Sequence, residues 1–178
     1  TWYQSEAGHG CPISMTYAAV PALNVDPAVA AQWVPGLTSS TYDFGLRTPQ
    51  SKAGLIAGMS MTEKQGGSDV RTNTTTATPI QGEPGTYRLD GHKWFCSAPM
   101  SDLFLVLGQT EGGLTCFVVP RVLPDGTRNV FRIQRLKEKL GNRSNASSEI
   151  EFSNTWAQRL GDEGRGVKTI VEMVSATR

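Results

Sequence analysis

The first part of the chain has apolar residues at helical spacing. Met15, Ala18 and Ala22 recur every three or four positions, a pattern typical of one buried helix face. Asp26-Pro27 predicts the start of a second helix, because proline is favoured at the first helical position, and Pro35-Gly36 predicts its end. We therefore expect two short helices before residue 37.

From about residue 55 to residue 152 the pattern changes to short β-type runs separated by Gly, Asp and Pro. The expected strands cover residues 72–80, 86–89, 93–96, 103–107, 114–119, 130–133 and 148–152. Turns are expected at Asp90-Gly91, Glu111-Gly112-Gly113 and Pro124-Asp125-Gly126. Six or seven strands at this spacing favour a small antiparallel β barrel or sandwich.

A last helix is expected from Gly164 to the end of the chain. Its predicted buried face carries Val167, Ile170, Val171 and Val174. The order of helices, then strands, then a helix places the chain in the α+β class.

The composition excludes several classes of function. The chain has 178 residues, with 17 Lys+Arg against 16 Asp+Glu and a net charge of +1, which argues against binding nucleic acid or an anionic membrane by charge alone. No apolar run approaches the roughly 20 residues of a spanning helix, so no membrane partner is expected. The three cysteines are widely spaced, without the pattern of a metal site or a secreted disulfide scaffold. We therefore expect no metal, reduced thiols and a cytoplasmic location.

The segment richest in possible chemistry is G-M-S-M-T-E-K-Q-G-G-S-D-V, residues 58–70. Gly66-Gly67 permits backbone conformations that turn several amides toward one ligand, and Thr62 and Ser68 add hydroxyl donors. Such a loop suits an oxygen-rich anion. It matches neither a Walker A loop nor a dinucleotide fingerprint, and an ordinary turn is the alternative interpretation.

A second segment, G-H-K-W-F-C-S-A-P, covers residues 91–99. Trp94 and Phe95 followed by Ser97 could offer a flat apolar surface beside a hydrogen-bond donor, as a planar heterocycle requires. The alternative is that the two aromatic residues are core residues on opposite faces of a strand.

Together, in this order and about thirty residues apart, the two segments resemble the acyl-CoA dehydrogenase family. The T-E-x-x-x-G-S-D stretch of that family is matched by Thr62, Glu63, Gly67, Ser68 and Asp69, and its G-x-K-x-W-I-[TS] strand by Gly91, Lys93 and Ser97. Together with K-L-G-N-R-S-N-A-S at residues 139–147, the sequence of these segments resembles the AidB-like branch of the family, the adaptive-response flavoproteins. The resemblance covers essentially the whole chain.

The resemblance implies a domain organisation. Residues 1–54 would be the end of an N-terminal helical domain, residues 55–157 the middle β-barrel domain, and residues 158–178 the truncated start of a C-terminal helical domain. It also implies a homo-oligomer, expected to be a tetramer.

The resemblance further implies FAD as the cofactor. In the family, the T-E threonine hydrogen-bonds the flavin ring, its neighbours supply backbone amides, and the G-S-D serine contacts FAD phosphates and the substrate. An ungapped alignment puts Phe95 on the family's tryptophan, so Phe95 would pack the flavin and Trp94 would lie in the core. The expected cofactor-binding residues are Met59, Ser60, Met61, Thr62, Gly67, Ser68, Phe95, Cys96 and Ser97.

The implied reaction is α,β-dehydrogenation of an acyl thioester, in which a carboxylate removes the α-proton and hydride passes to flavin N5. One branch of the family places that base at the position of Thr177, which cannot act as one. We therefore expect no catalytic residue in this chain and a base beyond Arg178, with Ser68, Thr177 and Arg178 contacting an acyl-CoA-like substrate.

Two alternatives remain open. An AidB-like flavoprotein would protect DNA from alkylation damage and bind duplex DNA through a C-terminal domain that this chain lacks. In the second alternative, the β domain holds no cofactor when it is detached, because the family's FAD sites are completed by the C-terminal domain and a neighbouring subunit.

The remaining polar candidates are expected to be structural. His9 lacks a ligand-spaced partner, and the family pattern puts His92 and Lys93 on a strand edge. Glu63 and Asp69 are expected to stabilise turns as acceptors. The basic run at residues 132–143 is expected to be a solvated strand edge or subunit contact.

Overall fold

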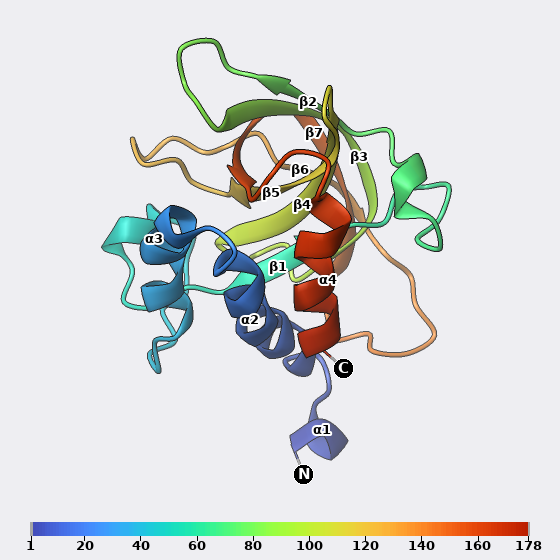
Figure 1. The fold of residues 1–178 in the computed structure, drawn as a ribbon. Coiled ribbons are helices and arrows are strands. Elements are labelled where there is room, and N and C mark those ends of the chain that lie inside the picture. The colour runs from blue at the N-terminus through green and yellow to red at the C-terminus, as the bar shows by residue number, and fades with distance from the viewer. Residues whose placement is uncertain (1, 178) are drawn as a thin grey trace.

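The computed structural model describes residues 2–177 and places the helices on one side of a β barrel (Figure 1). The helices are α1 (Trp2–Ser5), α2 (Gly10–Leu23), α3 (Pro27–Leu37) and α4 (Gly166–Ala176). At the start of α3, the Asp26 carboxylate accepts hydrogen bonds from the amides of Ala28 and Val29 at 3.1 and 3.3 Å, and Pro27 takes the first helical position. The two helices expected before residue 37 are confirmed.

Five strands close the barrel. The strands are β1 (Ala57–Ser60), β2 (Thr76–Pro79), β3 (Thr86–Ser97), β4 (Leu103–Thr110), β5 (Gly113–Pro120), β6 (Arg132–Leu136) and β7 (Ser147–Leu160), with short 3-10 turns at Pro49–Ser51 and Val70–Thr72. The ring runs β4-β2-β3-β7-β5 and returns to β4. β1 pairs with β4 and β2 with β4 in parallel, and the other strand pairs within residues 2–177 are antiparallel. The expected barrel with flanking helices is confirmed.

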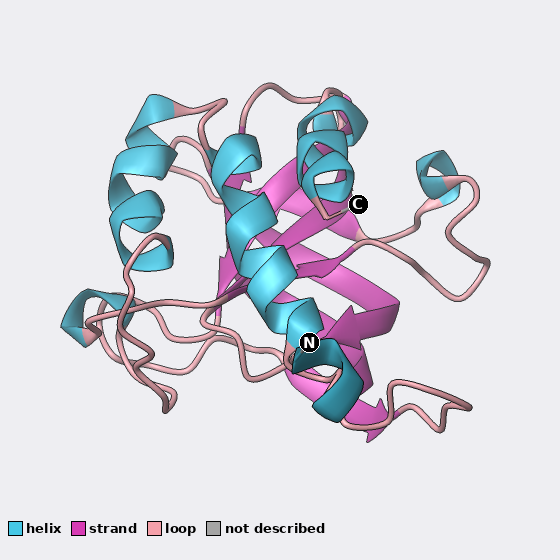
Figure 2. Cartoon of the chain, turned by 90° about the horizontal axis from the view of Figure 1, so that it is seen from below, coloured by secondary structure: helices cyan, strands magenta, loops and turns pink. Residues whose placement is uncertain are grey.

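Two hydrophobic cores share the barrel wall. Along β4, Leu103, Leu105 and Leu107 face the helices, whereas Phe104 and Val106 face the barrel interior. Because both faces of β4 are buried, its sequence is a continuous apolar run instead of an alternating one. α2 and α4 lie side by side over this wall (Figure 2).

The prediction of a turn at Asp90-Gly91 is wrong. β3 continues through both residues as one strand of 12 residues, and its register with β7 shifts between Leu89 and Gly91, which is a β-bulge. Glycine is needed there because a Cβ at Gly91 would lie 2.7 Å from the Thr75 Cα. The dipeptide that predicts a turn therefore marks a close approach of two strands instead.

Other boundaries differ from expectation by a few residues. β7 is much longer than the predicted strand because it continues along β3 and its last residues, 158–160, pair with β5 and close the barrel. The strand predicted at residues 130–133 lies at Arg132–Leu136, and that at 72–80 is only Thr76–Pro79.

The last helix begins two residues later than predicted, and its buried face differs from the expected one. That face carries Thr169, Ile170 and Met173, whereas Val171 is exposed.

β6 lies outside the barrel. It pairs only with β7, all five of its residues are exposed, and its register is interrupted by a shift between Ile133 and Arg135. The first part of the basic run, residues 132–136, is thus an exposed strand, whereas Lys137 is only 8% exposed and pairs with Glu149; that the run is a subunit contact stays a prediction.

Candidate functional site

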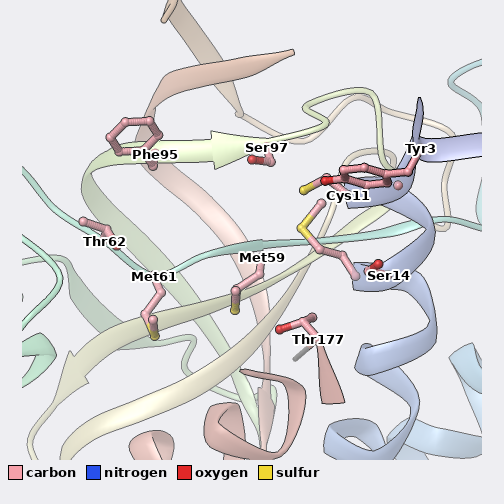
Figure 3. Close-up of a pocket in the computed structure, with 11 residues that line it drawn as sticks. Tyr3, Cys11, Ser14, Met59, Met61, Thr62, Phe95, Ser97 and Thr177 are labelled. Carbon is pink, nitrogen blue, oxygen red and sulfur yellow. The ribbon is translucent and has the colours of Figure 1, made fainter. Parts of the chain in front are cut away.

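A cavity of about 360 Å³ lies between the barrel and the helices (Figure 3). Its volume falls within the roughly 300–1,000 Å³ usual for small-molecule sites. Its walls come from α1, α2, the end of β1, β3 and the turn after α4, and the residues that line it are Tyr3, Gly10, Cys11, Ser14, Met15, Met59, Met61, Thr62, Phe95, Ser97 and Thr177.

The end of β1 forms one wall. Met59 lies on β1, and Met61 and Thr62 follow it (Figure 3). The loop is tied to β3 where the Trp94 amide donates to the Thr62 carbonyl at 2.9 Å. This hydrogen bond holds the first family segment against the second, so the two motifs meet in one cavity.

The end of β3 forms a second wall, which a bulge shapes. The β3–β7 register shifts between Lys93 and Cys96, and a bulge can turn a side chain out of its expected alternation. Phe95 is 43% exposed and faces the cavity, whereas Lys93 and Cys96 are fully buried. Phe95, which the family alignment puts beside the flavin, thus lies in the wall of the cavity, and its contact with a ring stays a prediction.

The α2 wall was missed from the sequence. Cys11, Ser14 and Met15 line the cavity from positions three and four residues apart, so they occupy one face of α2 (Figure 3). The helical periodicity included Met15 but could not show that this edge of the face points at a ligand cavity instead of the core.

Some expected site residues lie away from the cavity. Ser60 and Cys96 are fully buried with their side chains away from it, and Gly67 and Ser68 are exposed on the loop before β2. Burial raises the pKa of the Cys96 thiol to about 12, so it stays protonated at neutral pH. Only backbone groups of Ser60 and Cys96 could take part in a site here.

Thr177 lies at the cavity wall, and its hydroxyl donates to the Val174 carbonyl at 2.7 Å. Arg178, the other expected substrate-contacting residue near the end, lies outside the described residues. None of the cavity-lining residues given above carries a carboxylate.

Lys93 is not on a strand edge. Its side chain is 0% exposed inside the barrel, and Nζ lies 2.7 Å from Glu63 Oε1 and 2.8 Å from the Leu107 carbonyl. The strand-edge assignment failed because the residue that neutralises this lysine is thirty positions away in sequence. Glu63 is an acceptor, as expected.

Trp94 is not a core residue. It is half-buried, and the Lys137 ammonium lies 3.2 Å from the centre of its ring. Lys137 also pairs with Glu149 at 2.7 Å, so the ring is covered by a neutralised lysine.

The remaining polar candidates lie outside the cavity wall. Asp69 accepts from the Arg71 amide at 3.1 Å, the turn-stabilising role expected of it. His9 and His92 each lie near a carboxylate, Glu6 at 2.8 Å and Glu149 at 3.7 Å. Within residues 2–177, no group of three or more His, Cys, Asp or Glu side chains could hold a metal ion, and no helix is long and apolar enough to cross a membrane.

The free donors in the cavity fit a flat heterocycle with polar edges. Across the described part of the chain, the hydroxyls of Thr62 and Ser14 have no hydrogen-bond partner, and Ser97 Oγ is reached only by Asn145 Nδ2 at 3.5 Å. Met59, Met61 and Phe95 supply apolar surface beside these hydroxyls. The residues present therefore suit the ring system of a flavin.

The barrel with its flanking helices is the fold of the acyl-CoA dehydrogenase middle domain. Residues 58–155 match the family model described as acyl-CoA dehydrogenase, middle domain, so the chain belongs to the acyl-CoA dehydrogenase family. Residues 1–44 match the model described as adaptive response protein AidB N-terminal domain, which confirms the resemblance to the AidB-like branch. Membership of this family implies FAD as the cofactor.

Individual relatives agree. The chain is 56% identical over 176 residues to the putative acyl-CoA dehydrogenase AidB of Escherichia coli, covering 98% of this chain and 32% of that protein. It is 35% identical to acyl-CoA dehydrogenase family member 11 of Caenorhabditis elegans, covering 94% and 28%. The chain thus spans about a third of the length of the curated relatives it matches.

A solved structure of Caenorhabditis elegans ACDH-11 in complex with C11-CoA superposes with a TM-score of 0.80 at 33% identity. The match covers 94% of this chain and 29% of that one.

Proposed function

We propose that this chain supplies the flavin-binding wall of an FAD-dependent oxidoreductase of the acyl-CoA dehydrogenase type. The observation that carries the proposal is the meeting of Thr62, Phe95 and Ser97 at one cavity, although the two segments are thirty residues apart. The hydroxyl of Thr62 is unpartnered among residues 2–177, so it can donate to a ligand without breaking an internal bond.

Bound in this cavity, FAD would supply the hydride acceptor for oxidation of an acyl thioester. The hydroxyls of Thr62 and Ser97 would donate to the polar edge of the ring, where they stabilise negative charge without reorganisation because the backbone already holds them in place. Phe95 and the two methionines would exclude water from the ring face. The general base is expected beyond Arg178, since the cavity wall has no carboxylate.

An acyl-CoA-like molecule is the proposed substrate, and a homotetramer the proposed assembly. The ligand of ACDH-11 supports the first, because that protein shares the fold at 33% identity. Thr177 at the cavity wall and Ser68 on the neighbouring loop are the proposed substrate contacts within the described residues.

The test uses the protein at its full natural length. We expect it to purify with a flavin absorption spectrum, and Thr62→Val with Ser97→Ala to weaken FAD binding by about tenfold to hundredfold, one lost hydrogen bond each. Thr78→Val, on an exposed position of β2, is the matched control and should bind FAD normally. Colourless wild-type protein that cannot be reconstituted with FAD would exclude the flavoprotein proposal.

A second candidate is protection of DNA from alkylation damage, with duplex DNA bound outside this chain. The match of residues 1–44 to the adaptive response protein model favours it. Salt-dependent binding of duplex DNA by the full-length protein, with no turnover of acyl-CoA substrates, would favour this function over the first.

A further inference from the structure

Glu63 and Lys93 form an ion pair enclosed in the barrel, next to the candidate flavin cavity. Their side chains are 3% and 0% exposed, and 2.7 Å separates Lys93 Nζ from Glu63 Oε1. Lys93 also donates to the carbonyl of Leu107 on β4 at 2.8 Å. One charged pair therefore links the loop after β1 to both β3 and β4.

Glu63 collects four more donors from the far end of the same loop. Its Oε2 accepts from the Thr74 amide at 2.6 Å and the Thr74 hydroxyl at 2.9 Å, and its Oε1 accepts from the Thr75 amide at 3.1 Å and hydroxyl at 2.6 Å. Both ends of the loop between β1 and β2 are thus bound to one carboxylate.

The pair is directly connected to residues that line the cavity. Thr62 immediately precedes Glu63, and its carbonyl accepts from the Trp94 amide, the residue after Lys93. The Met61 carbonyl accepts from Asn73 Nδ2 at 2.9 Å. A displacement of Glu63 or Lys93 would therefore move Thr62 and the Phe95-bearing end of β3 together.

Stability alone does not explain the pair. Charges that are removed from water cost desolvation energy, and well-packed apolar residues often replace a buried ion pair without loss of stability. A carboxylate with five donors, in contrast, permits only one arrangement of the chain segments that carry those donors.

We propose that Glu63 and Lys93 are positioning residues of the flavin site, which hold the Thr62 hydroxyl and the Phe95–Ser97 end of β3 at the spacing that the ring requires. The inference rests on the proposed function. Neither side chain lines the cavity, so each acts through Thr62 and β3.

The chain contains a matched control pair. Lys52 and Asp102 are 2.6 Å apart and 3% and 2% exposed, so their distance and burial are close to those of Glu63 and Lys93. Asp102 Oδ2 accepts from the Ile56 amide at 2.9 Å, just before β1, and neither residue lines the flavin cavity.

The experiment compares Glu63→Gln with Asp102→Asn in the full-length protein. Each substitution replaces a carboxylate by an amide within a buried pair. Three quantities are measured: the dissociation constant for FAD, the reduction potential of the bound flavin, and amide hydrogen exchange of the cofactor-free protein. We expect Glu63→Gln to weaken FAD binding by about tenfold, shift the potential and accelerate exchange over residues 61–75. Asp102→Asn should leave the potential and that exchange unchanged.

Equal effects of the two substitutions on the potential and on FAD binding would overturn the positioning role. Wild-type protein that binds no FAD would instead overturn the proposed function, and this inference with it. If Glu63→Gln does not fold, Glu63→Leu with Lys93→Met removes both charges at similar volume. A folded double variant with wild-type FAD affinity and potential would then refute the inference.

Discussion

Two lysine–carboxylate pairs are buried at opposite ends of β1, and the pKa values of their carboxyl groups are shifted in opposite directions. In the upstream pair, Lys52–Asp102, burial raises the pKa of Asp102, and the hydrogen bonds from Lys52 and the Ile56 amide do not offset it. In the downstream pair, Glu63–Lys93, burial also acts to raise the pKa of Glu63, but the hydrogen bonds from Lys93, Thr75 and the Thr74 amide outweigh it and lower the pKa to about 2.

The difference lies in the donors and not in the ion pair itself. The distances, 2.6 and 2.7 Å, are nearly equal, and all four side chains are almost fully buried. Asp102 has two donors to its carboxylate, whereas Glu63 has five. A buried charge is thus stabilised by the number of hydrogen bonds that converge on it, and one lysine is not sufficient.

The largest difference in stability between the two pairs is expected when each carboxylate is removed. We expect Glu63→Ala to lower the free energy of unfolding by about 3–5 kcal/mol, because it leaves the buried Lys93 ammonium without its counter-charge and the two buried donors of Thr75 without an acceptor. Asp102→Ala removes the counter-charge of Lys52, which still donates to the Gly45 carbonyl at 3.1 Å, and leaves one amide, that of Ile56, without its acceptor, so its cost should be smaller. Urea denaturation measures both, and an equal or reversed order would contradict the role given to the donors.

In acid, the two carboxyl groups should change the stability of the fold in opposite directions. The pKa of Glu63 is lowered from 4.5 to about 2, so its contribution is fully present above pH 4.5 and is lost as the pH falls toward 2. The pKa of Asp102 is raised from 3.8, so its contribution is present below pH 3.8 and is lost as the pH rises through the raised value.

Glu63→Gln should therefore make stability fall less steeply with acid than in the wild type, and Asp102→Asn should make it fall more steeply. Denaturation midpoints between about pH 2 and 6 test this. Slopes that change in the same direction in both variants would refute the assigned pKa directions.

A smaller difference in stability is expected from substitution of a polar residue next to each pair. Asn73→Ala removes the buried donor to the Met61 carbonyl, and we expect a loss of about 1–2 kcal/mol in the free energy of unfolding. Arg47→Ala, near the upstream pair, removes a surface ion pair with Asp43 and should not change the denaturation midpoint measurably. A comparable shift for both variants would show that the downstream loop is no better anchored than the upstream one.

Much of the architecture follows from local sequence. The cap at Asp26-Pro27 and the β4–β5 hairpin across Glu111-Gly112 lie where the pattern predicts them, because each depends only on neighbouring residues. The continuity of β3 could not be predicted, since Asp90 and Gly91 are turn residues by composition. Their role here depends on Thr75 and Asn154, whose amide donates to Asp90 at 2.8 Å.

The candidate site was predictable from two family segments, but its supporting contacts were not. Thr62, Phe95 and Ser97 share the cavity, as the resemblance implies, and their role there stays a prediction. The burial of Lys93 was not anticipated, because no local pattern shows a partner at Glu63. The sequence shows only that the first segment contains the acidic residue Glu63 and the second the basic residue Lys93, which does not indicate that the two pair.

The exposed strand β6 bears on whether molecules of this protein associate edge to edge. A closed barrel leaves few unpaired strand edges, but β6 is exposed along its whole length and contains Ile133 and Leu136, which could attract a strand from another chain. Its register shift interrupts the ladder, and Arg132 and Arg135 place like charges on any second copy laid along it. Substitution of these arginines by threonine would therefore turn a protected edge into a template for aggregation.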